Sequence, residues 1–421
     1  MTLDTAAPGD YAADGTDPAV LDAADPLASF PPRFLPSDDV VSYLDGNSLG
    51  RPLAATLGRL DRFVRHDWGS RLIRSWDEQW MDLPTTLGDR IGALCLGAAP
   101  GQTVVADSTT VLLYKAIRAA LDFGQRSGRS EIVIDDDQFP TDRFVVEGIA
   151  EERGATIRWI HVDKTLGVTP DLLAPVVGPS TAVVVVNHIS YRSGFLADLA
   201  EVTRVVHEAG ALIVWDLCHS TGVVPIELDA AGVDFAVGCT YKYLNGGPGA
   251  PALAYVATRL LDELAQPIQG WMGAADVFSM APAYEPAPSI RRFLSGTPPI
   301  LGMLAMQDML DAIEEAGIEA IRAKSLALTD YAFALADAWL VPLGVKTATP
   351  RERGMRGSHV TLTHPSFREV TALLWQQGVV PDFRGPDALR IGLSPLSTTF
   401  VEVQVGVAAI RDALLTLEEE S

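Results

Sequence analysis

The chain has 421 residues, of which 54 are acidic and 32 basic, and its formal net charge is −22. This acidic balance argues against nucleic acid and anionic membranes as partners. Hydrophobic residues make up 48% of the chain, enough to bury a large core, and the length predicts two or three domains.

The composition also bears on compartment and on metals. Three cysteines, Cys95, Cys218 and Cys239, lie in apolar or strand-end contexts without metal-ligand spacing. We therefore expect buried, reduced thiols, a cytoplasmic protein and no metal site. Every apolar run is too short for a membrane span, and the N-terminus has neither the basic region nor the apolar region of a secretory signal.

The N-terminal part of the chain changes character near residue 30. Residues 1–28 are rich in Ala, Asp, Pro and Gly and contain no Lys or Arg, which predicts a disordered arm. Ordered structure is expected from Phe30, with a strand at 40–44, a turn at 45–50 and a helix at 53–66. An aromatic-dense loop should follow, which contains Trp68, Trp76 and Trp80.

From residue 87 to residue 260, helical and strand patterns alternate. The predicted strands cover residues 103–106, 131–134, 156–162, 181–186, 211–215 and 235–237. Helices are expected after the first two of these strands and at 199–209. Such alternation predicts an α/β fold, with a mostly parallel sheet wrapped by helices.

The remaining chain predicts a smaller α+β unit. Residues 267–300 are irregular and rich in proline, and a helix at 302–316 precedes a second helix at 318–340. Further elements are strands at 358–363 and 389–393 and helices at 366–377 and 399–418. We expect a large domain at 61–300, a small domain at 301–421, and an N-terminal segment at 29–60 that joins the small domain.

Two neighbouring predicted strands end in polar side chains. The run 211–215 ends at Asp216, and the run 235–237 leads to Tyr241 and Lys242 before a glycine-rich turn. The carboxyl ends of parallel strands lie at one edge of a sheet, where ligands bind. A lysine and a carboxylate are what pyridoxal phosphate requires, for its Schiff base and its pyridinium nitrogen. The alternative is a surface ion pair at the rim of the sheet.

A second candidate is the start of the helix after the strand 103–106. Ser108, Thr109 and Thr110 supply hydroxyl groups there. Such hydroxyls commonly cap a helix, and they can equally hold a phosphate against its free N–H groups.

Several separated motifs carry a resemblance to a known family. They are Leu-Asp-Gly-Asn-Ser-Leu-Gly at 44–50, Asp-Ser-Thr-Thr-Val at 107–111, Phe-Pro-Thr-Asp at 139–142, Tyr-Arg-Ser-Gly at 191–194, Trp-Asp-Leu-Cys-His-Ser at 215–220, Gly-Cys-Thr-Tyr-Lys-Tyr at 238–243, Phe-Leu-Ser-Gly-Thr-Pro-Pro at 293–299 and Leu-Arg-Ile-Gly-Leu-Ser-Pro-Leu at 389–396. From residue 40 to the C-terminal helix, their order and spacing resemble the kynureninase family of class V, fold-type I pyridoxal-phosphate enzymes. The resemblance implies a large domain with a mostly parallel seven-stranded sheet and a smaller α+β domain.

The resemblance implies roles for the cofactor-binding residues. Lys242 would form the Schiff base and move the proton of the substrate Cα, and Asp216 would hold the pyridinium proton. Tyr241 would bind the phosphate and act as an acid or base. The other implied cofactor contacts are Thr109 and Thr110 at the phosphate, Phe139 on the ring face, Asp142 and His219 beside the ring, and Trp271 and Thr297 from a neighbouring subunit.

Some of these residues have ordinary structural alternatives. His219 could bond a backbone carbonyl, Phe139 could be a core residue, and Asp142 could stabilise a helix N-terminus.

The family's substrate is a small amino acid, and its carboxylate would bind to Arg390, close to Asn47 and Ser48. A planar guanidinium matches two carboxylate oxygens. The alternative for Arg390 is a structural ion pair, because the alternating pattern at 389–393 predicts a strand there.

The implied reaction is hydrolysis of L-kynurenine, or of a 3-hydroxy or methyl derivative, to an anthranilate and L-alanine by a cytoplasmic homodimer with shared sites. Such an enzyme would serve tryptophan catabolism, NAD biosynthesis or secondary metabolism. The sequence departs from the family pattern at Ala274, where the family usually has His, and at Ser397, where it often has Tyr. Ala274, together with Thr297, where some relatives carry Asn, suggests a ring-substituted substrate. The alternatives are another class V enzyme (an aminotransferase, epimerase or lyase) and a cofactor-binding module without turnover.

Overall fold

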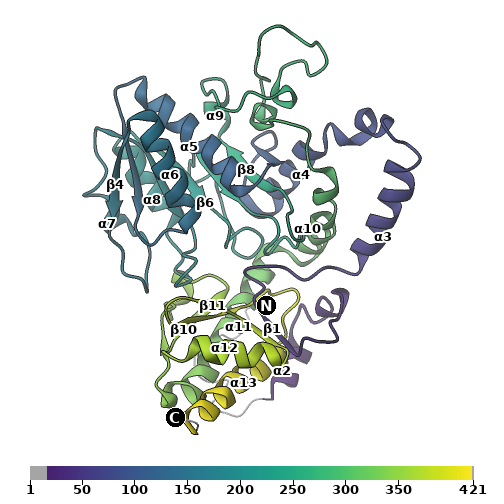
Figure 1. The fold of residues 1–421 in the computed structure, drawn as a ribbon, viewed down its shortest axis with the longest axis vertical. Coiled ribbons are helices and arrows are strands. Elements are labelled where there is room, and N and C mark those ends of the chain that lie inside the picture. The colour runs from purple at the N-terminus through teal and green to yellow at the C-terminus, as the bar shows by residue number, and fades with distance from the viewer. Residues whose placement is uncertain (1–16, 420–421) are drawn as a thin grey trace.

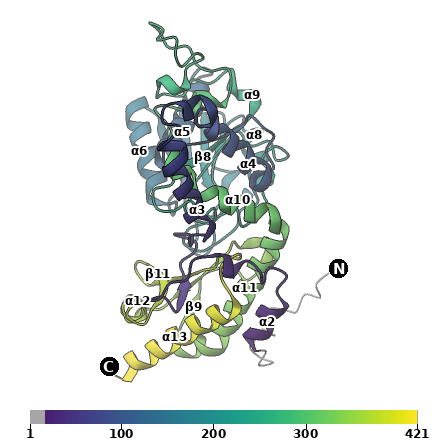
Figure 2. The ribbon, with the colours of Figure 1, turned by 90° about the vertical axis from the view of Figure 1, so that its right-hand side faces the viewer.

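The structure, a computed structural model, describes residues 17–419 and contains two units stacked along the long axis (Figures 1 and 2). The larger unit is built on a seven-stranded sheet and the smaller one on a five-stranded sheet. Each sheet has its own buried apolar core. The α/β fold is therefore confirmed. None of the helices within 17–419 is long and apolar enough to cross a lipid bilayer.

The large sheet has the strand order β2-β8-β7-β6-β5-β3-β4. Its strands are β2 (Thr103–Ala106), β3 (Glu131–Asp135), β4 (Thr156–Ile160), β5 (Thr181–Asn187), β6 (Leu212–Asp216), β7 (Phe235–Gly238) and β8 (Ala252–Val256). The pairs from β7 to β4 are parallel, and β8 is antiparallel to both of its neighbours. The mostly parallel sheet is thus as predicted. The sequence pattern did not predict β8, because the short apolar run at Ala252–Val256 does not by itself distinguish a strand from a buried helix.

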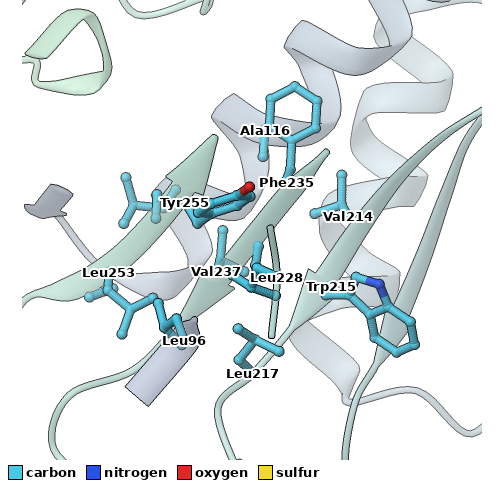
Figure 3. Close-up of a cluster of buried hydrophobic side chains, with 14 of the residues drawn as sticks. Leu96, Ala116, Val214, Trp215, Leu217, Leu228, Phe235, Val237, Leu253 and Tyr255 are labelled. Atoms are coloured by element: carbon cyan, nitrogen blue, oxygen red, sulfur yellow. The ribbon is translucent and has the colours of Figure 1, made fainter. Parts of the chain in front are cut away.

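Helices pack against this sheet and against each other. They are α4 (Leu83–Ile91), α5 (Thr109–Gln125), α6 (Pro140–Arg153), α7 (Pro170–Leu173), α8 (Leu199–Glu208) and α9 (Thr258–Leu261). In the apolar cluster of Figure 3, Trp215 and Phe235 lie on the two strands that lead to the site. Trp215 is fully buried, and its indole N–H donates to Thr203 Oγ1 at 3.1 Å. The strand ends therefore stand on a rigid support.

The small sheet has the strand order β1-β11-β12-β10-β9. Its strands are β1 (Ser42–Leu44), β9 (Lys346–Thr347), β10 (His359–Thr363), β11 (Val379–Arg384) and β12 (Ala388–Gly392). The pair β1–β11 is parallel, and the other pairs are antiparallel. The sequence pattern did not predict β11, because Pro381 is unusual in a strand and the charged residues beside it break the apolar pattern.

The helices of the C-terminal half follow the predicted ranges closely. They are α10 (Ala305–Ala316), α11 (Ile318–Trp339), α12 (Phe367–Gln376) and α13 (Phe400–Glu419). Near its start α11 contributes Ile321 to the large core, and further on it contributes Leu328 to the small core. This helix therefore links the two units, as Figure 2 shows.

The N-terminal segment corrects one prediction. Residues 1–16 of the expected disordered arm lie outside the described residues, but residues 17–28 are ordered. They include α2 (Pro18–Ala24), which is capped by Asp17 and packs against α13. The Asp22 carboxylate accepts the N–H groups of Phe400 and Val401 at 2.7 and 3.1 Å. The acidic residues that predicted disorder thus serve as helix caps.

The segment around the tryptophans corrects another prediction. The predicted helix 53–66 is present as α3 (Ala55–Arg62) and a π-helical turn. The expected loop is largely helical, and the rings of Trp76 and Trp80 pack edge to face with centroids 5.4 Å apart. The π-helical turns are Phe63–Trp68, Trp76–Trp80 and Gly92–Leu96, and the 3-10 turns are Pro31–Arg33, Trp271–Gly273, Ile290–Phe293, Ile300–Met303, Val341–Leu343 and Arg353–Met355.

The small unit depends on a buried ion-pair network. Asp330 on α11 is fully buried and pairs with Arg353 and with Arg356, which is also fully buried. We expect Asp330→Ala to lower the free energy of unfolding by about 3–5 kcal/mol, because it leaves the Arg356 guanidinium buried without its carboxylate. Urea denaturation measures this loss. Asp337→Ala removes an exposed pair with Arg351 and should cost only about 0–1 kcal/mol, so equal losses would contradict the prediction.

Candidate active site

A cavity opens at the carboxyl ends of the parallel strands, beside the start of α5. It is lined by eight of the residues that the sequence analysis assigned to the cofactor: Thr109, Thr110, Phe139, Asp142, Asp216, His219, Tyr241 and Lys242. The lining residues that were not assigned a role are Thr141, Asn187, Ile189, Tyr191 and Cys218. Asn187 is the last residue of β5, so its position at a parallel strand end was the available signal.

Lys242 and His219 form the amine end of the cavity. Lys242 follows β7 and is half-buried, and its Nζ lies 3.3 Å from Nε2 of His219. Burial, and then the charges of Lys242 and Arg390, hold the pKa of His219 well below its usual value. His219 is therefore a neutral imidazole. Its Nε2 contacts the lysine amine, whereas the structural alternative was a hydrogen bond from His219 to a backbone carbonyl.

Carboxyl groups form another part of the cavity lining. Asp216 ends β6, and its Oδ1 accepts the N–H of Cys218 at 2.8 Å. Asp142 is buried, and its Oδ2 has no hydrogen-bond partner among residues 17–419. Burial, and then the charges of Asp216 and Asp135, raise the pKa of Asp142 well above its usual value. Burial also raises the pKa of Asp135 to about 7. A cationic group bound here would reduce the repulsion between these carboxylates. The protonated ring nitrogen of a bound pyridoxal phosphate would be such a group.

The N-terminus of α5 forms a third wall. Ser108 caps the helix through an N–H donated by Val111 at 3.5 Å, and Thr109 and Thr110 are its first residues. A helix of this length presents free N–H groups and the positive end of its dipole, and both favour a phosphate. The cavity therefore offers an anion site, an amine and a carboxylate cluster, the set that pyridoxal phosphate needs.

The loop before α5 is held by a buried lysine that the sequence analysis missed. Lys115 is wholly buried, and its Nζ donates to Asp107 Oδ2 at 2.6 Å and to the Phe293 carbonyl at 2.5 Å. Asp107 has a positive φ of 43°, an uncommon backbone conformation for a residue other than glycine. The ion pair thus stabilises the conformation of the loop from which α5 starts.

Phe139 supplies an aromatic face. It is 37% exposed, and its ring meets the ring of Tyr191 edge to face at 5.3 Å. It precedes Pro140, the first residue of α6. The alternative that Phe139 is a core residue is therefore wrong, and its position suits stacking on a planar ring.

The predicted carboxylate-binding residues lie next to the cavity, on the small unit. Arg390 is 1% exposed; its Nε donates to Asp382 Oδ2 at 2.6 Å, and its other nitrogens donate to the Tyr191 carbonyl at 2.6 Å and to Ser48 Oγ at 3.1 Å. The structural ion pair that was the alternative for Arg390 is thus present. Asn47 is buried, and within the described part of the chain neither its side-chain nitrogen nor its side-chain oxygen has a hydrogen-bond partner.

Trp271 and Thr297 do not reach the cavity of their own chain. Both are exposed, and the ring of Trp271 meets that of Phe278 edge to face, with centroids 6.5 Å apart. Their contact with the cofactor of a neighbouring subunit stays a prediction.

Comparisons of the sequence agree with this geometry. The family profile of class-V aminotransferases matches residues 91–380. The chain is 40% identical to a kynureninase from Pseudomonas fluorescens over 403 residues, which are 94% of this chain and 95% of that protein. It is 42% identical over 402 residues to a kynureninase from Burkholderia pseudomallei strain 1106a, with 94% of each chain covered.

Comparisons of the structure give the same fold. A cysteine desulfurase from Thermococcus onnurineus matches with a TM-score of 0.79 at 17% identity, covering 92% of this chain and 98% of that one. The cystine C-S lyase C-DES, in complex with cysteine persulfide, matches with a TM-score of 0.78 at 18% identity, covering 88% of this chain and 97% of that one. At these identities the two structures support the fold alone.

Proposed function

The chain belongs to the kynureninase family within the class-V aminotransferases, and from this premise we propose that it hydrolyses L-kynurenine, with or without a ring substituent, to an anthranilate and L-alanine. It is a pyridoxal-phosphate enzyme that acts on a carbon–carbon bond. The observation that supports this most strongly is that Lys242, Asp216 and the start of α5 line one cavity.

The residues of the cavity fit each part of the cofactor. Thr109 and Thr110 would hold the phosphate at the N-terminus of α5, Phe139 would face the ring, and Asp216 would bind the ring nitrogen. When bound, pyridoxal phosphate supplies the electron sink on which cleavage of the bond depends. Lys242 would bind its aldehyde, at the side where His219 contacts the amine.

The chain's own groups hold and move the protons. Lys242 would take the proton of the substrate Cα, and the neutral His219 beside it adds no positive charge that would oppose this transfer. Burial raises the pKa of Tyr241, so its phenol keeps its proton at neutral pH and is placed to act as an acid. Arg390 would orient the carboxylate, and its ion pair with Asp382 fixes the direction of the guanidinium.

Product analysis tests the reaction. Purified protein loaded with pyridoxal phosphate should release anthranilate, detected by fluorescence, and L-alanine in equal amounts from L-kynurenine. An aminotransferase would instead exchange the amino group with a keto acid and release no anthranilate. Absence of both anthranilate and alanine under saturating cofactor would reject the proposed function.

The ring substituent is a finer part of the proposal. Ala274 follows the 3-10 turn Trp271–Gly273 and stands where the family usually has His, and Thr297 stands where some relatives carry Asn. We propose that this chain prefers a substituted kynurenine. Values of kcat/KM for kynurenine, 3-hydroxykynurenine and a ring-methylated kynurenine decide this, and a clear preference for the unsubstituted compound would contradict it.

A homodimer is also part of the proposal. Two segments project from the body in Figure 1, one around α3 and one in the loop beyond α9. Both have exposed, large apolar side chains. These are Leu57, Val64, Trp68, Leu72 and Ile73 in the first segment, and Trp271, Phe278 and Met280 in the second. Exposed apolar patches mark interaction surfaces. Light scattering should give twice the mass of 45.0 kDa, and a monomer that remains fully active would contradict shared sites.

Domain limits and location complete the proposal. We propose that the two cores correspond to a large domain at 61–300 and a small domain at 301–421. Residues 29–60 would belong to the small domain, because β1 pairs with β11 in the small sheet. The three cysteines within the described chain form no disulfide, which supports the cytoplasm as the location.

A further inference from the structure

One buried histidine, His359 on β10, has no hydrogen-bond partner among the residues that the structure describes. It is 0% exposed, and neither of its ring nitrogens is bonded to any residue of 17–419. Buried polar atoms are nearly always paired, because an unpaired one has lost its hydrogen bonds to water without a replacement. A fully buried imidazole with two unpaired nitrogens therefore requires an explanation.

His359 faces the site from the small sheet. In the antiparallel pair of β10 and β12, Thr361 lies opposite Arg390, and His359, two residues away, is on the same face as both. Its ring centroid lies 5.7 Å from that of His219, whose Nε2 is 3.3 Å from Lys242 Nζ. The imidazole of His359 thus lies close to that of His219 and shares a face of the small sheet with Arg390.

A glycine makes room for the ring. Gly194, which follows the cavity residue Tyr191 by three positions, has a φ of +76°, and a Cβ there would lie 3.2 Å from Nε2 of His359. A larger residue at position 194 would be strained in its backbone and would press on the imidazole. The local structure therefore accommodates the ring in this place.

The charge state of His359 decides what it can bind. Burial, and then the charges of Arg390 and Lys242, hold its pKa well below the usual value. The ring is therefore neutral, with one nitrogen as a donor and the other as an acceptor. A neutral donor can bond an anion without adding a second buried positive charge beside Arg390.

We propose that His359 is a substrate-binding residue, which donates a hydrogen bond to the α-carboxylate of the bound amino acid beside Arg390. In an α-amino acid one carbon separates the amino group from the carboxylate. A substrate whose amino group lies at Lys242 therefore has its carboxylate within reach of groups close to that lysine. His359 is such a group, because its ring packs near that of His219, which contacts the amine of Lys242. Arg390 already bonds Asp382, so an additional neutral donor completes the anion site. The inference rests on the proposed function.

The test compares two ligands that differ only in the carboxylate. L-alanine and L-alaninamide are titrated into the enzyme loaded with pyridoxal phosphate, and their dissociation constants are read from the visible absorbance. His359→Leu should weaken L-alanine about tenfold, the loss of one hydrogen bond to a charged group, and should weaken L-alaninamide clearly less, because its neutral carbonyl oxygen accepts a weaker hydrogen bond. His359→Gln, which keeps an N–H donor, should recover most of this loss.

Stability separates binding from packing. His359→Leu should keep or raise the thermal midpoint, because it removes an unpaired buried polar group. Equal weakening of both ligands, or no change for L-alanine, would overturn the inference. The control His161→Leu changes a histidine whose side chain is 84% exposed and should alter neither dissociation constant. Failure of the wild-type enzyme to release anthranilate would instead reject the proposed function, independently of these titrations.

Discussion

Replacement of Lys242 by alanine is expected to lower kcat roughly 10³-fold or more, because the variant loses the group that binds the cofactor aldehyde and the base for the substrate proton. The cavity contains no second lysine among its lining residues to replace it. Anthranilate fluorescence at saturating pyridoxal phosphate measures the rate, and the visible absorbance of the protein should shift because the lysine–cofactor bond is absent.

A matched control is available on the surface. Lys164 is exposed and lies outside the cavity lining, so Lys164→Ala should leave kcat and the absorbance unchanged. If Lys242→Ala retained more than about a tenth of the wild-type kcat, well above what the loss of a general base allows, its assignment as the reactive lysine would be wrong.

Asp216→Asn is expected to lower kcat roughly 10²–10³-fold, because a neutral amide does not stabilise a positive charge on the ring nitrogen during the reaction. The amide oxygen can still accept the N–H of Cys218, so the strand end should keep its shape. Steady-state kinetics of anthranilate release measure the loss. The control Asp262→Asn changes a side chain that is 88% exposed and should have no effect.

Asp142 gives this prediction a second readout. The charge of Asp216 is one cause of the raised pKa of Asp142, so Asp216→Asn should lower the pKa of Asp142 and leave it more ionised at neutral pH. The remaining carboxylate would then partly replace the lost charge. The kcat of the double variant Asp216→Asn/Asp142→Asn should therefore be lower than the product of the two single-variant reductions predicts. If the double variant instead showed that product, Asp142 would not compensate for Asp216.

The sequence predicted the parts of the site that have a local signal. Asp216 and Lys242 follow apolar runs that end in polar residues, and the rule for parallel strand ends brings them to one edge. Thr109 and Thr110 follow a strand and begin a helix, which is again a pattern within a few residues. The structure confirms that all four line one cavity.

The remaining residues depend on partners far away in the chain. The ion pair of Arg390 with Asp382 requires β11, a strand that the sequence pattern did not indicate. Lys115 is buried against Phe293, 178 positions away, and nothing near it in sequence marks it as buried. His359 occupies an ordinary alternating strand, so its lack of a partner is visible only when the two units are placed together.

The pairing of β1 with β11 has a consequence for synthesis. The strands of the large sheet lie between residues 103 and 256, so this sheet can close while the chain is still being made. Residues 42–44 instead pair with residues 379–381. Closing so long a loop is slow, and domains generally fold as units during translation. On the ribosome the first strand therefore waits for nearly the whole polypeptide, and Arg390 reaches the Tyr191 carbonyl only after the large sheet can have folded.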